Sequence, residues 1–476
     1  MGPMRKSVSL LAIAALLASC GGGGQGGGAT GTITPSPPPT STACSLRSRQ
    51  DFVLTSLNSD YLFPETLPAN TDPTPFATVT EYIDFLTATA RTQRRDRFFT
   101  FLTSIAEENA FNNSGATAGF GIRISTDVAA RRLFVAEAFE GAPALAAGID
   151  RGSEIVAIGT SPNDLRSVGD IIAAEGSAGI SNALGPTTAG VTRLLRVTDA
   201  QGTRDLSVTK ASFALSPVSS RYGTRIIDDN GRRIGYLNLR TFISTADPQL
   251  RASFDQFRAA GISQFIIDFR YNGGGLVSTA ELMGDLLGGN RAQSEVFSFT
   301  RFRPERASRN ATRRFNPQAQ SVSPVKIAFI ATGATASASE LVINSFIPYL
   351  GINLALVGGN SFGKPVGQIA LDRAACDDRL RVVAFSTANS ANSDGYFDGL
   401  AASVGTTCQA ADDINRPLGD PQEASTRAAL DFLAGRSCAP ITIGGQASQS
   451  ARAAPQPTML SPANPTVAQR EIPGLF

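Results

Sequence analysis

Four short apolar runs alternate with segments of helical periodicity between residues 213 and 436. The runs read RRIGYLNLRTF, QFIIDFRY, VKIAFIAT and NLALVGG, and PQLRASFDQFRAAG between the first two has apolar residues at helical spacing. Runs that are apolar along most of their length are typical of strands buried on both faces. Strands that alternate with helices form layered α/β structures. We therefore expect residues 213–436 to form an α/β core, a mixed sheet with flanking helices.

Two segments of different character precede this core. Residues 44–105 place apolar residues at helical spacing, as in VTEYIDFLTATA, and predict a small helical N-terminal domain. Residues 112–212 contain short alternating strands with glycine turns and predict an inserted β-rich domain. Within it, GAPALAAGIDRGSEIVAIG (141–159) indicates a short helix, a turn and a strand. A generic α/β fragment with glycine turns is the alternative.

The N-terminus has the features of an export signal. Arg5 and Lys6 precede LLAIAALLA, an apolar run that is too short to span a membrane but typical of a secretory signal peptide. The run ends in LASC, which resembles a bacterial lipobox with Cys20 as the lipidated residue. We expect residues 1–20 to be a lipoprotein signal peptide, and an ordinary signal peptide with a chance cysteine is the alternative. The expected location is the bacterial cell envelope, lipid-anchored at the outer membrane and facing the periplasm.

Two further segments have compositions that do not support a packed core. Residues 21–43 are rich in Gly, Pro, Ser and Thr and predict a flexible tether. Residues 439–476 are polar and rich in Pro, Ala and Gln, and we predict that they form a disordered tail.

Export to an oxidising compartment would allow disulfides among the remaining cysteines. Cys44, Cys376, Cys408 and Cys438 allow three connectivities, which sequence alone does not distinguish. We favour Cys376 with Cys408, because both flank one segment.

The absence of histidine narrows the chemistry that the chain can perform. It excludes a Ser-His-Asp triad and zinc sites with histidine ligands, and the cysteines contain no CxxC pair. We expect no metal and no cofactor. The formal charge of +2 is too small to indicate a nucleic-acid partner. A catalytic serine would need another base, and the only lysines are Lys6, Lys210, Lys326 and Lys364.

Three loops follow predicted strands at the edge where α/β sheets usually place their sites. They are DFRYNGGG (268–275), TASASE (335–340) and VGGNSFGKPVGQ (357–368). The glycine loop could present N–H groups to an anion or be a plain turn. Gly358 to Lys364 fits the G-x-x-x-x-G-K pattern of a phosphate loop, but Pro365 replaces the Ser or Thr that binds Mg²⁺. A nucleotide site is therefore not expected.

The serine loop has two interpretations. Ser337 and Glu340 fit a capping box that begins the helix SELVINSFIPYL. A serine at a helix N-terminus is also well placed as a nucleophile, because the N–H of Ala338 would face a developing oxyanion. Lys364 could be its base if burial lowers the pKa of the amine, and Gln368 could orient that amine.

These features together resemble the C-terminal processing peptidases, also called tail-specific proteases, in their lipoprotein form. TASASE, FGKPVGQ and DFRYNGGG correspond to the nucleophile, base and oxyanion loops of that family, and residues 112–212 resemble its PDZ domain. The resemblance implies Ser337 as the nucleophile, with Ser339 as the less favoured alternative. It implies the following further roles: Lys364 as base, Gln368 as its orienting partner, Ala338 with Gly274 or Gly275 as the oxyanion hole, and Gly119, Phe120, Gly121 and Ile122 as the loop that binds a peptide carboxylate.

The resemblance predicts an exported serine endopeptidase that acts through a Ser337–Lys364 dyad and an acyl-enzyme. Its partners would be proteins or peptides with accessible C-termini, captured by the PDZ-like domain as an added strand. One departure lies in the glycine loop, where Gly273 stands in place of a proline found in many members. The alternatives are a non-catalytic envelope protein that binds peptides or hydrophobic ligands on the same fold, and a PDZ-based scaffold.

Overall fold

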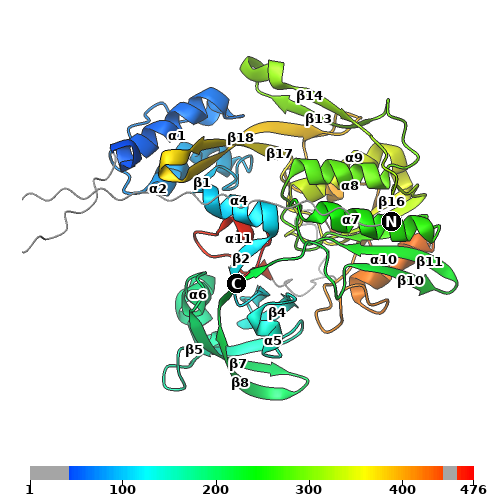
Figure 1. Ribbon diagram of the computed structural model, residues 1–476, viewed down its shortest axis with the longest axis horizontal. Coiled ribbons are helices and arrows are strands. Elements are labelled where there is room, and N and C mark those ends of the chain that lie inside the picture. The colour runs from blue at the N-terminus through cyan, green and yellow to red at the C-terminus, as the bar shows by residue number, and fades with distance from the viewer. Residues whose placement is uncertain (1–41, 443–457) are drawn as a thin grey trace, which may run out of the picture. The chain divides into compact units, whose positions relative to one another are not determined.

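The computed structural model describes residues 42–442 and 458–476 (Figure 1). The predicted signal peptide, the lipidation site at Cys20 and the tether up to residue 41 lie outside these ranges. Within the described residues, no helix is long and apolar enough to cross a membrane.

The four predicted strands lie in one six-stranded sheet, in the order β10–β11–β12–β15–β16–β19. β10 runs antiparallel to β11, and all other neighbours are parallel, which confirms the predicted mixed sheet. The strands span Thr224–Asp229 (β10), Arg232–Asn238 (β11), Gln264–Asp268 (β12), Lys326–Ala331 (β15), Leu354–Gly358 (β16) and Thr406–Gln409 (β19).

Helices cover both faces of this sheet (Figure 1). Successive strand residues point to opposite faces, so Phe265 and Ile267 pack on one side and Ile266 on the other. The first side is covered by α7 (Ala246–Ala259), α8 (Val277–Leu287) and α9 (Ala338–Leu350), and the second by α10 (Ala424–Leu433). Burial on both faces explains why these strands are apolar almost throughout.

A second, five-stranded sheet joins the N-terminal helices to the core. Its order is β1–β18–β13–β14, and β17 also pairs with β18. The bounds are Phe101–Ser104 (β1), Val296–Phe302 (β13), Ala311–Arg314 (β14), Val366–Arg373 (β17) and Asp378–Ala388 (β18). The predicted helices are present as α1 (Leu46–Asp60), α2 (Val79–Leu86) and α3 (Ala88–Thr92). Their buried side chains share one cluster with Val366 and Leu380, so a separate helical domain is not confirmed.

A β-rich insert leaves the core through a two-stranded ribbon, in which β2 (Ala116–Gly119) pairs with β9 (Ala211–Ala214). Its main sheet has the order β20–β3–β4–β5–β7–β8, with β6 beside β5. The bounds are Ile122–Asp127 (β3), Arg132–Ala138 (β4), Glu154–Gly159 (β5), Arg166–Ser167 (β6), Thr192–Asp199 (β7), Gly202–Thr209 (β8) and Thr458–Met459 (β20), with helices α5 (Pro143–Ala146) and α6 (Val168–Leu184). That this insert is a PDZ domain stays a prediction.

The C-terminal segment contradicts the expected disordered tail. Residues 458–476 contain β20 and α11 (Val467–Glu471), and the side chains of Ile472, Leu475 and Phe476 are buried. Leu475 lies in one hydrophobic cluster with Phe111 of α4 (Ile105–Ser114), and Phe476 lies in the core of the insert. The prediction was wrong because it rested on the average polarity of residues 439–476. The few apolar side chains of this segment are buried by residues far away in the sequence. Residues 443–457 lie outside the described ranges.

The two disulfides are Cys44–Cys376 and Cys408–Cys438, so the favoured Cys376–Cys408 pairing is wrong. The Cα–Cα distances of 5.5 and 5.2 Å suit a disulfide in each pair. Cys376 lies in the turn between β17 and β18, beside the start of α1, whereas Cys408 lies in β19 of the other sheet. Closeness in the sequence was therefore a poor guide to closeness in space.

Candidate active site

The three predicted loops meet at the carboxyl ends of β12, β15 and β16, three neighbouring strands of the six-stranded sheet. The Thr335 hydroxyl donates to the carbonyl of Phe269 at 2.8 Å, and the Phe362 N–H donates to the carbonyl of Thr335 at 2.8 Å. The N–H of Ala336 donates to the carbonyl of Asn272 at 3.0 Å. These bonds fix the serine loop (335–340) between the glycine loop (268–275) and residues 357–368, the lysine loop.

Ser337 is held in a backbone conformation that is unusual for a residue with a side chain. Its φ of +57° and ψ of −114° place it directly before α9. Non-glycine residues pay a steric cost for such a positive φ, and they are enriched at functional sites. Gly274 lies against this serine, since a Cβ on Gly274 would approach the Ser337 Cβ to 2.7 Å. Glycine at 274 therefore allows the glycine loop to come close to the candidate nucleophile.

Glu340 joins the serine loop to the lysine loop. Its side chain is fully buried and accepts the N–H of Ser337 at 3.0 Å, as the predicted capping box requires. It also accepts the N–H groups of Gly363 at 2.6 Å and Lys364 at 2.7 Å. Burial raises the pKa of Glu340, and these three N–H groups oppose that rise. The sequence predicted the helix cap but gave no signal for the bonds to Gly363 and Lys364.

Lys364 is half-buried and has a side-chain partner in the described part of the chain. Its Nζ donates to Oε1 of Gln368 at 3.1 Å, and Nε2 of Gln368 donates to the carbonyl of Phe99 at 2.5 Å. The Nζ lies 4.8 Å from the centroid of the Phe99 ring. Removal of the amine from solvent lowers the pKa of Lys364 below its ordinary value. The structure thus brings Lys364 and Gln368 together, but in the described residues no hydrogen bond joins Lys364 to the Ser337 hydroxyl.

The candidate oxyanion donors differ in whether their N–H groups already have a hydrogen-bond acceptor. The N–H of Gly274 donates to Oδ1 of Asn272 at 2.9 Å, and the N–H of Gly273 donates to the carbonyl of Glu471 at 2.9 Å. Among the described residues, the N–H groups of Gly275 and Ala338 have no acceptor. Of the two glycines predicted for this role, Gly275 therefore has the available donor.

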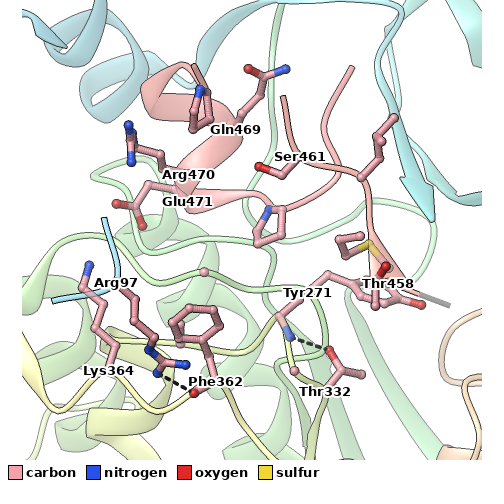
Figure 2. Close-up of a pocket in the computed structure, with 18 of the residues that line it drawn as sticks. Arg97, Tyr271, Thr332, Phe362, Lys364, Thr458, Ser461, Gln469, Arg470 and Glu471 are labelled. Atoms are coloured by element: carbon pink, nitrogen blue, oxygen red, sulfur yellow. Dashed lines mark hydrogen bonds between the residues drawn. The ribbon is translucent and has the colours of Figure 1, made fainter. Parts of the chain in front are cut away.

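Ser339 is placed as a supporting residue. Its buried hydroxyl donates to the carbonyl of Asn272 at 3.2 Å, so it stabilises the glycine loop. Arg97, which the sequence did not indicate, also supports the site. Its guanidinium donates to the carbonyls of Phe362 at 2.8 Å and Gly363 at 2.5 Å in the lysine loop (Figure 2). No local pattern could reveal this contact, because the partners are more than 260 positions apart.

The predicted carboxylate-binding loop already holds an oxygen of the chain itself. The N–H groups of Gly121 and Ile122 donate to the carbonyl oxygen of Phe476 at 2.9 and 3.2 Å. Gly119 packs against the same group, since a Cβ there would lie 2.8 Å from the Phe476 carbonyl carbon. Phe120 is buried in the core of the insert. All four predicted residues, Gly119 to Ile122, therefore lie at one site.

A cavity of about 1170 Å³ lies beside the three loops. It is lined by Lys364, Gln368 and Gly273, and by much of the segment from Thr458 to Pro473 (Figure 2). Such a volume is ample for a peptide segment.

Residues 233–396, which contain all three loops, match Peptidase family S41. A carboxyl-terminal-processing protease of Picosynechococcus sp. is 26% identical over 253 residues, 53% of this chain and 56% of the relative. Carboxyl-terminal-processing peptidase 3, chloroplastic, of Arabidopsis thaliana is 28% identical over 190 residues, 38% and 34% of the two chains. The matched region thus spans about half, or less, of these curated relatives.

The fold has a solved counterpart in an S41 protease from Bacteroides fragilis. The two are 22% identical, with a TM-score of 0.62, over 81% of this chain and 97% of the other. The likeness extends well beyond the matched residues 233–396 and shows that the overall fold is shared. Sequence match, loop order and fold agree: residues 233–396 match peptidase family S41, and the chain is similar to carboxyl-terminal-processing proteases.

Proposed function

We propose that this protein is a serine endopeptidase in which Ser337 is the nucleophile and Lys364 the general base. The arrangement of Glu340 carries the proposal, because one buried carboxylate fixes the backbone of both residues. The lowered pKa of Lys364 supports a neutral amine that accepts a proton. The names of the relatives, carboxyl-terminal-processing proteases, agree with this activity.

The reaction would proceed through an acyl-enzyme. Lys364 takes the proton of the Ser337 hydroxyl as its Oγ bonds to the scissile carbonyl carbon. The N–H groups of Ala338 and Gly275 stabilise the resulting oxyanion. The lysine ammonium then gives its proton to the leaving amine nitrogen as the C–N bond breaks. Water attacks the ester, Lys364 takes its proton, and that proton returns to Ser337 as the acid product leaves.

Substrates would be captured by their C-terminal tails. The edge of β3 and the N–H groups of Gly121 and Ile122 suit an added peptide strand with its terminal oxygen in the loop. In this respect the insert would act as a PDZ domain. We further propose that lipid on Cys20 anchors the protein in the bacterial cell envelope, at the outer membrane and facing the periplasm, as the lipobox-like sequence suggests.

The test is cleavage of an unfolded protein with an apolar C-terminal tail, by wild type and by three single variants. We expect Ser337→Ala and Lys364→Ala to lose activity by about a thousandfold or more. Ser339→Ala is the matched control, and we expect it to lose about tenfold or less, as for one hydrogen bond. If wild type binds the tail without cleaving it at any pH, the protein is a binding protein and the proposal is wrong.

A further inference from the structure

The segment 458–476 returns twice to the same edge of β3. Thr458 and Met459 pair antiparallel with Thr126 and Ser125. Further along, the N–H of Phe476 donates to the carbonyl of Ile122 at 2.9 Å, and the N–H of Ile124 donates to the carbonyl of Gly474 at 2.7 Å. Residues 474–476 therefore pair with the edge of β3 that an added peptide strand would use.

Between these two stretches, the segment passes over the catalytic loops. The carbonyl of Glu471 accepts the N–H of Gly273, and the fully buried guanidinium of Arg123 donates to the carbonyls of Pro473 at 2.9 Å and Tyr271 at 2.7 Å. The Glu471 side chain points toward Lys364 in Figure 2. The segment is thus bonded both to the groove and to the glycine loop.

The fit at Gly273 is close. A Cβ on Gly273 would lie 2.6 Å from the carbonyl oxygen of Arg470 and 2.9 Å from that of Glu471. Any other residue at 273 would push the segment away, and a proline would also remove the N–H that holds it. Glycine at this position is what allows the segment to lie on the loop.

The groove also selects the side chain that it holds. Phe476 is 3% exposed and belongs to the hydrophobic core of the insert, together with Phe120 and Leu195. Burial of a phenyl side chain is favourable because it removes a large apolar surface from water. A ligand that ends in a small or charged residue would lose this contribution.

We propose that residues 458–476 are a resident intramolecular ligand, which occupies the peptide groove and covers the catalytic loops until a C-terminal tail ending in a large apolar residue displaces it. For its effect on cleavage the inference depends on the proposed peptidase function, but occupancy of the groove does not. Residues 458–476 and the C-terminal tail of a substrate need the same N–H groups of Gly121 and Ile122, so only one of them can bind at a time.

The direct test is binding of a fluorescent peptide ending in Pro-Gly-Leu-Phe with a free carboxylate, measured by anisotropy. All proteins carry Ser337→Ala so that nothing is cleaved. In Phe476→Asp we expect the apparent Kd to fall by about tenfold or more, because an occupied groove weakens apparent affinity by the fraction that is free. Asn290→Ala, at an exposed residue outside the segment, is the control and should leave the Kd unchanged.

A second variant weakens the contact between the segment and Gly273. It is needed because Phe476→Asp could destabilise the insert. Gly273→Ala places a methyl group against the carbonyls of Arg470 and Glu471 and leaves the groove intact. We expect it to tighten peptide binding and to speed hydrogen exchange at the N–H groups of Gly121 and Ile122. Equal affinity and equal exchange in all of these proteins would overturn the inference, as would the absence of peptide binding in every one.

Cleavage assays with Ser337 restored separate this inference from the proposed function. We expect Phe476→Asp to cleave an added substrate severalfold faster than wild type. If cleavage depends on Ser337 and is unaffected by Phe476→Asp, the resident-ligand inference is wrong and the peptidase stands. If the peptide competes with the tail and no variant cleaves, the ligand inference stands and the peptidase proposal is wrong.

Discussion

The loops of the candidate active site and the edge of β3 are both held by backbone hydrogen bonds, but the partners differ. At the loops, the acceptor is the carboxylate of Glu340, which belongs to the same core and is fully buried. At β3, the partner is a separate segment, residues 458–476, whose bonds a peptide could reproduce. Catalytic groups require fixed positions before substrate arrives, whereas a recognition edge requires a partner that exchanges. One region is suited to rigidity and the other to replacement.

The largest effect that would test this contrast is expected from Glu340→Gln. The amide replaces one acceptor oxygen with an NH₂ group that faces an N–H donor, so a buried group loses its bond. We expect the free energy of unfolding to fall by about 1–3 kcal/mol, and kcat/KM to fall by about a hundredfold as the two loops separate. Denaturant titration and peptide cleavage measure the two quantities.

Glu81→Gln is the matched control for this change. Glu81 accepts the N–H of Thr78 at 3.0 Å in a capping box of the same pattern, but its side chain is exposed on α2. We expect a change of about 0.5 kcal/mol or less and unaltered activity. Similar losses in both variants would mean that Glu340 acts only as a helix cap and does not position the lysine loop.

A smaller effect is expected from Arg97→Lys, which weakens the hydrogen bonds between residue 97 and the lysine loop. Arg97→Lys keeps the charge but loses the planar group that reaches the carbonyls of Phe362 and Gly363. We expect kcat to fall by about tenfold, with little change in KM, because orientation of Lys364 is lost and groove binding is kept. Arg94→Lys is the control, since Arg94 is exposed and pairs with Asp398 at the surface. Equal rates for both variants would contradict this role.

The sequence predicted correctly that the three loops lie at one edge of the sheet, and physical reasons explain why. Apolar strands, a capping box and glycine clusters are local patterns, and neighbouring parallel strands bring their ends together. The partners of Gly121 and Gly273 were missed because they depend on distant residues, Phe476 and Glu471. A short apolar stretch in a polar segment is buried only when distant residues cover it, and those residues cannot be identified from the local pattern.

The smallest expected effect concerns the charge that the segment brings to Lys364. The charged groups that act on this amine are Glu471, Asp96, Arg470 and Glu340, and the Glu471 carboxylate is the strongest of them. A nearby negative charge favours the ammonium form, so Glu471 raises the pKa of Lys364 against the lowering caused by burial.

Glu471→Gln removes that charge and keeps the backbone carbonyl that holds the segment on Gly273. The pKa of Lys364 should then fall further, and more of the lysine is neutral at any given pH. The acid limb of kcat/KM, which reports the free enzyme, should therefore move to lower pH, while the rate on the alkaline plateau stays the same. Glu107→Gln, an exposed carboxylate on α4, should leave the profile unchanged. Burial raises the pKa of Glu471 itself, so a profile that does not move in Glu471→Gln would mean either that Glu471 is neutral in the free enzyme or that the segment has left the loops.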